Sequence, residues 1–259
     1  MRMTKTSLRT AALAAGSVLL ALSAVPSRVA AQVHGEPRDA DQAEEFHEEP
    51  PILATLLIDR LEHRWRDGEN SIDWEVQGWI GGDTNKAWFN AEGSKAVDGE
   101  VEEAEFQLLY SRMTSEFWDF QAGIRHDVRP RPQTTYGVVG FQGVAPYFFD
   151  VTAQLFLSED GDLSARLEAE YDLLITQKLV LQPVAEVNVS AQRVRELHVG
   201  PGFNDVELGL RLRYEVVREF APYVGVNWER KLGETADIAR DHGEDPSDLS
   251  FVTGVRFWF

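Results

Sequence analysis

The stretch VELGLRLRYEV, residues 206–216, decides the fold because its side chains alternate in character at every step. Valine, leucine and tyrosine occupy the even-numbered positions, and glutamate, glycine and arginine occupy the odd-numbered ones. A repeat of two residues is typical of a β-strand, whose side chains point alternately to opposite faces. A second stretch, LSARLEAEYDL at residues 163–173, follows the same rule. The sequence therefore predicts strands with one apolar face and one strongly charged face.

Strands of this kind fit two classes of β-protein. In a soluble sheet the apolar face packs into a core and the polar face contacts bulk water. In a transmembrane barrel the apolar face contacts lipid and the polar face lines a lumen. The apolar faces here often end in an aromatic residue, and the polar faces carry charges of both signs. Both features favour the barrel.

The rest of the chain supplies further segments of strand length, separated by turn signals such as Asp67-Gly68. Strands are expected at residues 56–65, 72–77, 85–94, 103–110, 118–125, 136–144, 147–157, 163–173, 177–190, 206–216, 220–230 and 249–259. The first segment could also be a short helical turn, and residues 232–248 are expected to form a long polar loop. The pattern predicts an all-β protein: an antiparallel up-and-down transmembrane barrel of about twelve strands. The aromatic end, Phe257-Trp258-Phe259, resembles the terminal signature of bacterial outer-membrane proteins.

The N-terminus has the composition of a secretory signal peptide. Arg2, Lys5 and Arg9 precede an apolar run at residues 11–25, and Val29-Ala30-Ala31 forms a small-residue cleavage site. The run is too short and too rich in alanine for a spanning helix. The expected organisation is a cleaved signal peptide at 1–31, an acidic N-terminal tail or plug segment at 32–55, and an outer-membrane β-barrel at 56–259.

Composition excludes several function classes. The chain has 25 basic and 43 acidic residues and a formal net charge of −18, which excludes a nucleic-acid partner because a phosphate backbone needs a basic surface. Removing residues 1–31 would take away four basic residues and no acidic ones, which gives −22. The absence of cysteine excludes disulfides, thiolate metal sites and a cysteine nucleophile. A role with cations stays open.

Several motifs together resemble the bacterial copper resistance protein B family of outer-membrane proteins. They are QGWIGGDTNK (77–86), AEFQLLYSR (104–112), FWDFQAGIRHD (117–127), GVAPY (143–147), EAEYDLLITQ (168–177), ELGLRLRYE (207–215), REFAPYVGV (218–226) and the terminal WF. The resemblance spans residues 56–259 and implies a barrel in the outer membrane of a Gram-negative cell. It also implies a function in copper resistance, by binding copper and either sequestering it or aiding its export. The implied partners are membrane lipid, copper ions and a periplasmic multicopper oxidase.

One departure from the family concerns the metal ligands. Members often carry a long Met- and His-rich region before the barrel, whereas here Met113 is the one methionine beyond residue 31. The tail holds only His34 and His47 among its carboxylates, so it is either an unstructured segment or a low-affinity metal-collecting tail. Because thioethers suit Cu(I) whereas imidazole and carboxylate suit Cu(II), a copper site in the barrel with Cu(II) as the ion is expected.

Two histidines in the barrel are candidate copper ligands. His63 lies near Asp59 and Glu62 at the end of the first segment, and His126 adjoins Asp127. Imidazole and carboxylate together form a suitable donor set for Cu(II). Strand parity, however, places His126 on the lipid side near a strand end. The full candidate metal set is therefore His63, His126, Asp127, Asp59, Glu62, His34 and His47.

The other singled-out residues have simpler interpretations. His198 and His242 lie in expected loops and are interpreted as surface residues. Trp88, Trp118, Trp228 and Trp258 are interpreted as aromatic girdle residues at the membrane interfaces. Met113 stands alone and is expected to serve in packing.

Charged residues on the predicted inner faces form the main constellation. They are Glu75, Glu103, Glu105, Asp119, Arg125, Asp127, Arg166, Glu168, Glu170, Asp172, Glu207, Arg211, Arg213 and Glu215. Charges in a low-dielectric interior must pair or remain hydrated. The set is therefore either an ion-paired plug that makes a narrow barrel rigid, or an acidic path or metal site for cations.

Three alternatives to copper handling follow from the same barrel. It could be a general or cation-selective porin, or a structural barrel without metal specificity. An outer-membrane lipase would need a Ser–His pair on the outer wall. Ser111 and His126 are the only loosely plausible partners, and no nucleophile motif surrounds Ser111. We therefore expect no enzyme activity and no catalytic cofactor.

Overall fold

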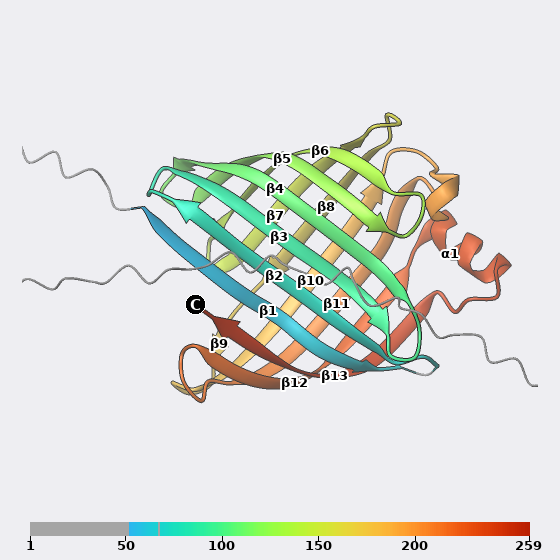
Figure 1. Ribbon diagram of the computed structural model, residues 1–259. Coiled ribbons are helices and arrows are strands. Elements are labelled where there is room, and N and C mark those ends of the chain that lie inside the picture. The colour runs from blue at the N-terminus through green and yellow to red at the C-terminus, as the bar shows by residue number, and fades with distance from the viewer. Residues whose placement is uncertain (1–51, 67) are drawn as a thin grey trace, which may run out of the picture. The chain divides into compact units, whose positions relative to one another are not determined.

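The computed structural model describes residues 52–66 and 68–259 (Figure 1). The signal peptide expected at 1–31 and the tail histidines His34 and His47 lie outside the described residues. The elements are β1 (Leu53–Trp65), β2 (Ser71–Gly81), β3 (Asn85–Ala96), β4 (Val101–Ser115), β5 (Trp118–Arg129), β6 (Thr134–Ala145), β7 (Phe149–Ser158), β8 (Leu163–Glu170), β9 (Leu173–Leu174), β10 (Leu179–Ser190), η1 (Arg195–Leu197), β11 (Gly202–Tyr214), β12 (Phe220–Lys231), α1 (Gly233–Asp241) and β13 (Ser247–Trp258).

The strands of this described part form one closed antiparallel barrel. Sequential neighbours pair with each other, β1 pairs with β13, and the β10–β11 pairing completes the ring (Figure 1). The two-residue β9 continues the line of β8, because both pair with β10. The strands therefore occupy twelve positions around the ring. This confirms the predicted fold class and strand number.

The two faces of the wall are distributed as the alternation predicts. Along β11, Leu208, Leu210 and Leu212 have 45%, 41% and 37% of their surface exposed on the outside. Arg211 and Arg213, which alternate with them, are 2% and 4% exposed and face the lumen. A soluble protein would place these two sets of residues the other way round. The exposed leucines therefore form the lipid-facing surface of a membrane barrel.

The two ends of the barrel differ in loop length. At one end the hairpins turn within residues 82–84, 116–117 and 146–148, and the barrel's own first and last residues lie there as well. At the opposite end run the long connections 191–201 and 232–246, with α1 in the second (Figure 1). We call these the short-turn end and the loop end. Outer-membrane barrels have short periplasmic turns and longer extracellular loops, so the loop end is assigned to the extracellular side.

Helix α1 corrects the expectation of an irregular loop at 232–248. Thr235, Ala236 and Ala239 are buried on the inner side of the helix. The backbone N–H of Gly200 and the side-chain amide of Asn204 both donate hydrogen bonds to Thr235 Oγ1, at 3.0 and 3.2 Å. The helix therefore depends on tertiary contacts with the β10–β11 connection and the start of β11, which local composition does not reveal. In the described part, neither α1 nor η1 has the length and apolar character to cross a membrane.

Strand boundaries also differ from the expectation at several points. β1 is a strand and not a helical turn, and it begins at Leu53 instead of residue 56. β7 begins at Phe149, because Tyr147 and Phe148 have left-handed backbone angles (φ 69° and 65°) and form the preceding turn. The pairing of β1 with β2 shifts register between Ile58 and Arg60. Such a bulge lets consecutive residues face the same side, and Asp59 and Arg60 both line lumen cavities.

A polar core lies inside the barrel between β1 and β11. Glu62, which is 1% exposed, accepts hydrogen bonds from Arg211 Nε (3.0 Å) and Nη2 (2.9 Å). Tyr223 Oη also donates to Glu62 at 3.0 Å, and Arg64 Nε donates at 2.9 Å. The carboxylate is therefore fully satisfied although it is out of contact with water. Breaking such a pair leaves an uncompensated buried charge.

We expect Leu208→Arg to destabilise the barrel by about 2–4 kcal/mol, because it places a cation against the centre of the lipid layer. Tyr214→Arg lies on the same face at the end of the same strand and should cost about 1 kcal/mol or less. Reversible denaturant unfolding in lipid vesicles, followed by tryptophan fluorescence, measures both. Equal costs would contradict the assignment of this face to lipid.

We expect Glu62→Ala to cost about 3–5 kcal/mol, because it leaves Arg211 buried without its partner. The Glu62→Ala/Arg211→Met double variant should recover part of that loss, which a double-mutant cycle measures as coupling. Asp237→Ala removes an exposed ion pair with Arg240 and should change the free energy of unfolding by less than about 1 kcal/mol. Strict additivity of Glu62→Ala and Arg211→Met would show that the pair contributes nothing.

Candidate functional site

The lumen contains two cavities, one toward each end of the barrel. The loop-end cavity has a volume of about 590 Å³ and is lined by fourteen acidic and seven basic residues. The short-turn cavity has a volume of about 520 Å³ and is lined by eight acidic and two basic residues. Glu75, Glu92 and Arg166 line both and therefore lie between them. Both cavities carry an excess of negative charge.

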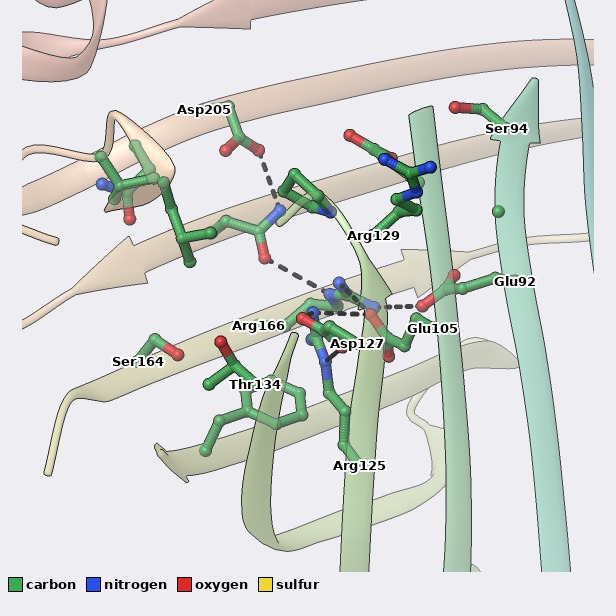
Figure 2. Close-up of a pocket in the computed structure, with 18 of the residues that line it drawn as sticks. Glu92, Ser94, Glu105, Arg125, Asp127, Arg129, Thr134, Ser164, Arg166 and Asp205 are labelled. Carbon is green, nitrogen blue, oxygen red and sulfur yellow. Dashed lines mark hydrogen bonds and ion pairs between the residues drawn. The ribbon is translucent and has the colours of Figure 1, made fainter. Parts of the chain in front are cut away.

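Two arginines cross the lumen between the cavities, and we call Arg60 and Arg166 the arginine belt. Arg166 on β8 pairs with Glu92 (2.5 Å) on β3, five strands away around the ring, and with Glu105 (3.2 Å) on β4. Figure 2 shows its guanidinium beside these two carboxylates. Arg60 on β1 pairs with Glu168 on β8 and with Glu75 on β2, both at 3.1 Å. The belt therefore joins opposite walls of the barrel.

An aromatic cluster on one inner wall supports these charges. Leu109, Tyr136, Val138 and Phe156 are buried together, with Trp88 packed against them. Arg125 pairs with Asp127 and Glu105 and lies 4.8 Å above the ring of Phe156 and 5.1 Å above that of Tyr136. The Arg166 guanidinium lies 5.8 Å from the Phe156 ring. Cation–π contact of this kind holds the guanidinium groups in place without neutralising their charge.

Other carboxylates in the cavities lack a basic partner. Glu103, Asp205 and Glu229 line the loop-end cavity without an ion pair to any described lysine or arginine. Asp205 accepts one hydrogen bond, from the Asn188 amide. These three come from β4, β11 and β12 and are free to attract a cation. Among residues 52–66 and 68–259, however, no group of three or more His, Asp or Glu side chains is already arranged to hold a metal ion.

The structure separates His63 from the carboxylates predicted beside it. His63 faces outward on β1, where its ring lies 4.3 Å from that of Trp65. Glu62 and Asp59 face the lumen, where they pair with Arg211 and Arg256. The strand wall therefore lies between the imidazole and both carboxylates.

His126 is separated from its predicted partner in the same way. Its Nδ1 lies 3.0 Å from Thr135 Oγ1 on the outer face of the wall. Asp127 points into the lumen and receives two hydrogen bonds from Arg125, at 2.7 and 2.8 Å. His63 and His126 lie on β1 and β5, so the structure does not bring the two imidazoles together.

The remaining predicted lumen charges form a chain of polar contacts. They pair as Asp119 with Lys86 (3.1 Å), Glu207 with Arg64 (3.3 Å), Arg213 with Asp172 (2.6 Å) and Glu215 (3.9 Å), and Glu170 with the Gln182 amide (2.9 Å). Most of these contacts join neighbouring or nearby strands. They give the lumen the hydrogen-bonded, ion-paired interior that is one of the two interpretations of the alternating pattern.

Sequence reasoning missed several lumen residues. Glu92 lies on a segment whose faces were not assigned, although Asn90, Glu92 and Ser94 alternate with less polar residues and could have indicated it. Trp88 and Trp118 line the short-turn cavity, which corrects their assignment to the membrane girdle. A tryptophan near a strand end fits either place, and only the register with β4 and β6 distinguishes them.

The Ser–His pair considered for a lipase does not form. Ser111 is fully buried in the lumen and donates a hydrogen bond to Asp119 at 3.2 Å. His126 lies on the outer face of the wall. A proton cannot pass directly between groups on opposite sides of the wall, so this pair supports no hydrolytic chemistry.

Known proteins match this chain over the whole described barrel. A family model described as copper resistance protein B precursor (CopB) matches residues 52–259. Copper resistance protein B of Escherichia coli is 45% identical over 204 residues, covering 79% of this chain and 69% of that protein. The copper resistance protein B homolog of Pseudomonas syringae pv. tomato is 42% identical over 210 residues, covering 80% and 70%.

A solved structure supports the fold alone. The NanC porin superposes with a TM-score of 0.54 at 13% identity, covering 76% of this chain and 98% of the porin. Such low identity carries no information on what passes through or binds inside the barrel. The family model, in contrast, matches residues 52–259, and the two relatives are 45% and 42% identical to this chain. This chain therefore belongs to the copper resistance protein B family.

Proposed function

We propose that this protein confers copper resistance from the outer membrane of a Gram-negative cell by binding Cu(II) in its acidic lumen, and so sequesters copper or aids its export. The observation that carries the proposal is the excess of carboxylates in both lumen cavities, on either side of the arginine belt. Membership of a family whose relatives are named for copper resistance supplies the ion.

The donor set fits a divalent cation. Clefts lined by one sign of charge between low-dielectric walls concentrate counter-ions. Glu103, Asp205 and Glu229 present unpaired carboxylates to the loop-end cavity. Carboxylate oxygens bind Cu(II) in preference to Cu(I), whereas the one thioether in the described part, Met113, lines the other cavity. Cu(II) is therefore the ion that the loop-end cavity suits.

The arginine belt favours retention over free diffusion. An ion that passes from one cavity to the other must pass the side chains of Arg60 and Arg166, whose ion pairs join opposite walls and obstruct the lumen. A general porin needs an unobstructed lumen. We therefore prefer slow, controlled handling of copper to unselective permeation, and we assign no enzyme activity.

We further infer how the chain reaches the outer membrane and which periplasmic protein it meets there. A signal peptide at 1–31 directs the chain through the inner membrane, and the short-turn end then faces the periplasm. A periplasmic multicopper oxidase would meet the barrel at that end.

We expect the triple variant Glu103→Gln/Asp205→Asn/Glu229→Gln to bind Cu(II) about 10-fold or more weakly, because the unpaired carboxylates are lost. Cu(II) titration of the purified mature barrel in detergent measures the affinity. Growth of a host deleted for the native gene and carrying the variant, in increasing copper, measures the function.

A matched triple, Asp98→Asn/Glu219→Gln/Asp237→Asn, neutralises three exposed carboxylates that line neither cavity and should leave both results unchanged. If both triple variants lost the same Cu(II) affinity, the loss would follow from the change in net charge, and a lumen site would be contradicted. His63→Ala and His126→Ala in the same titration test the sequence-based hypothesis that these imidazoles bind copper. Unchanged stoichiometry removes them from the site.

We expect the wild-type barrel to give a small conductance in planar bilayers and Arg166→Ala to raise it several-fold, because the substitution removes the group between the two cavities. Single-channel recording with cation and anion gradients measures conductance and selectivity. A large, unselective current from the wild type would instead favour the porin alternative.

A further inference from the structure

Two histidines from different loops meet at the loop end of the barrel, outside the lumen. His198 follows η1 in the β10–β11 connection, and His242 is the C-terminal cap of α1 in the β12–β13 connection. Their ring centroids are 4.7 Å apart with the planes inclined at 55°. Both side chains are exposed to solvent. We call these two residues the loop histidine pair.

The fold holds the two loops together beneath this pair. Thr235 near the start of α1 is buried and accepts hydrogen bonds from Gly200 N and from the Asn204 amide. Asn204, which is 3% exposed, also donates to Gly200 O at 2.6 Å. Because α1 is joined to the loop of His198 through buried contacts, the approach of the imidazoles is part of the folded framework.

One imidazole is already in the tautomer that a metal ligand needs. His242 Nδ1 lies 2.7 Å from the backbone oxygen of Ile238. A carbonyl oxygen can only accept a hydrogen bond, so Nδ1 must carry the proton and donate. The Nε2 lone pair of His242 is then free. A backbone carbonyl that receives the other N–H is the usual support of a metal-bound histidine.

A carboxylate lies close to the pair. Glu244 follows His242 by two residues and accepts a hydrogen bond from Lys231 at 2.9 Å. The ion pair with Lys231 holds the Glu244 carboxylate at the loop end, two residues from one of the nitrogen donors.

We propose that His198 and His242 bind one divalent transition-metal ion between their imidazoles at the mouth of the barrel, with Cu(II) bound most tightly. Imidazole suits copper, nickel and zinc, and among divalent first-row ions Cu(II) forms the most stable complexes with such donors. Water completes the coordination. The inference does not depend on the lumen site, because the loop histidine pair shares no residue with either lumen cavity.

The test uses the purified mature barrel in a zwitterionic detergent and a non-coordinating buffer, with Cu(II) as the probe. Low-temperature electron paramagnetic resonance of the wild type should show one ion coupled to two imidazole nitrogens. His198→Ala and His242→Ala should each weaken binding of that ion about 10-fold or more. The double variant should lose the same single ion and no other. His63→Ala and His126→Ala, whose imidazoles face outward on β1 and β5, should retain the two-nitrogen signal.

Three outcomes would overturn the proposal. They are a wild type with no nitrogen-coupled ion, single variants that bind like the wild type, and a double variant that loses two ions because the imidazoles bind independently. Since both side chains are exposed, heat-modifiable migration in gels should be unchanged and so reports that the variants fold. The lumen triple variant should keep the two-nitrogen signal, so failure of this proposal and failure of the lumen proposal give different results.

Discussion

The structure depends on ion pairs that cross the inside of the barrel. A sheet that spans lipid must close so that every backbone group is paired, and its outer surface must be apolar. The alternation of each strand then places the polar residues in a narrow lumen, where isolated charges would be costly. Glu62 with Arg211, and Arg60 with Glu75 and Glu168, satisfy one another there. The position of the two cavities follows from where these pairs meet.

The membrane constraint explains how much of the fold could be predicted. Lipid outside and charge inside impose a strict period of two on β8 and β11, so their faces and the strand number were predictable from sequence. The two-residue period no longer predicts which face a side chain points to where the backbone departs from a regular strand, as at the bulge of Asp59 and Arg60. It also fails where both faces are apolar. On β6, Tyr136 and Val138 line the lumen while Val139 and Phe141 face lipid.

The candidate site was less predictable, because its pairings join residues far apart in the chain. Parity placed Glu168 inside the barrel, but its partner Arg60 lies on the opposite wall and 108 residues away. Which carboxylates remain unpaired therefore depends on the closed topology. For the same reason His198 and His242 were interpreted as unrelated surface residues. The buried contacts of Thr235, together with the ion pair of Arg193 and Glu234, bring their loops together.

The distribution of charge along the lumen bears on what the barrel can do with a cation. Carboxylates outnumber basic residues in both cavities, so each attracts cations, whereas the ion pairs of Arg60 and Arg166 obstruct the lumen between them. Two favourable regions separated by a barrier hold an ion longer than an evenly lined channel would. If copper enters a cavity, as the proposed function requires, the ion would compete for Glu92 or Glu168, and the contacts that hold the belt in place would weaken.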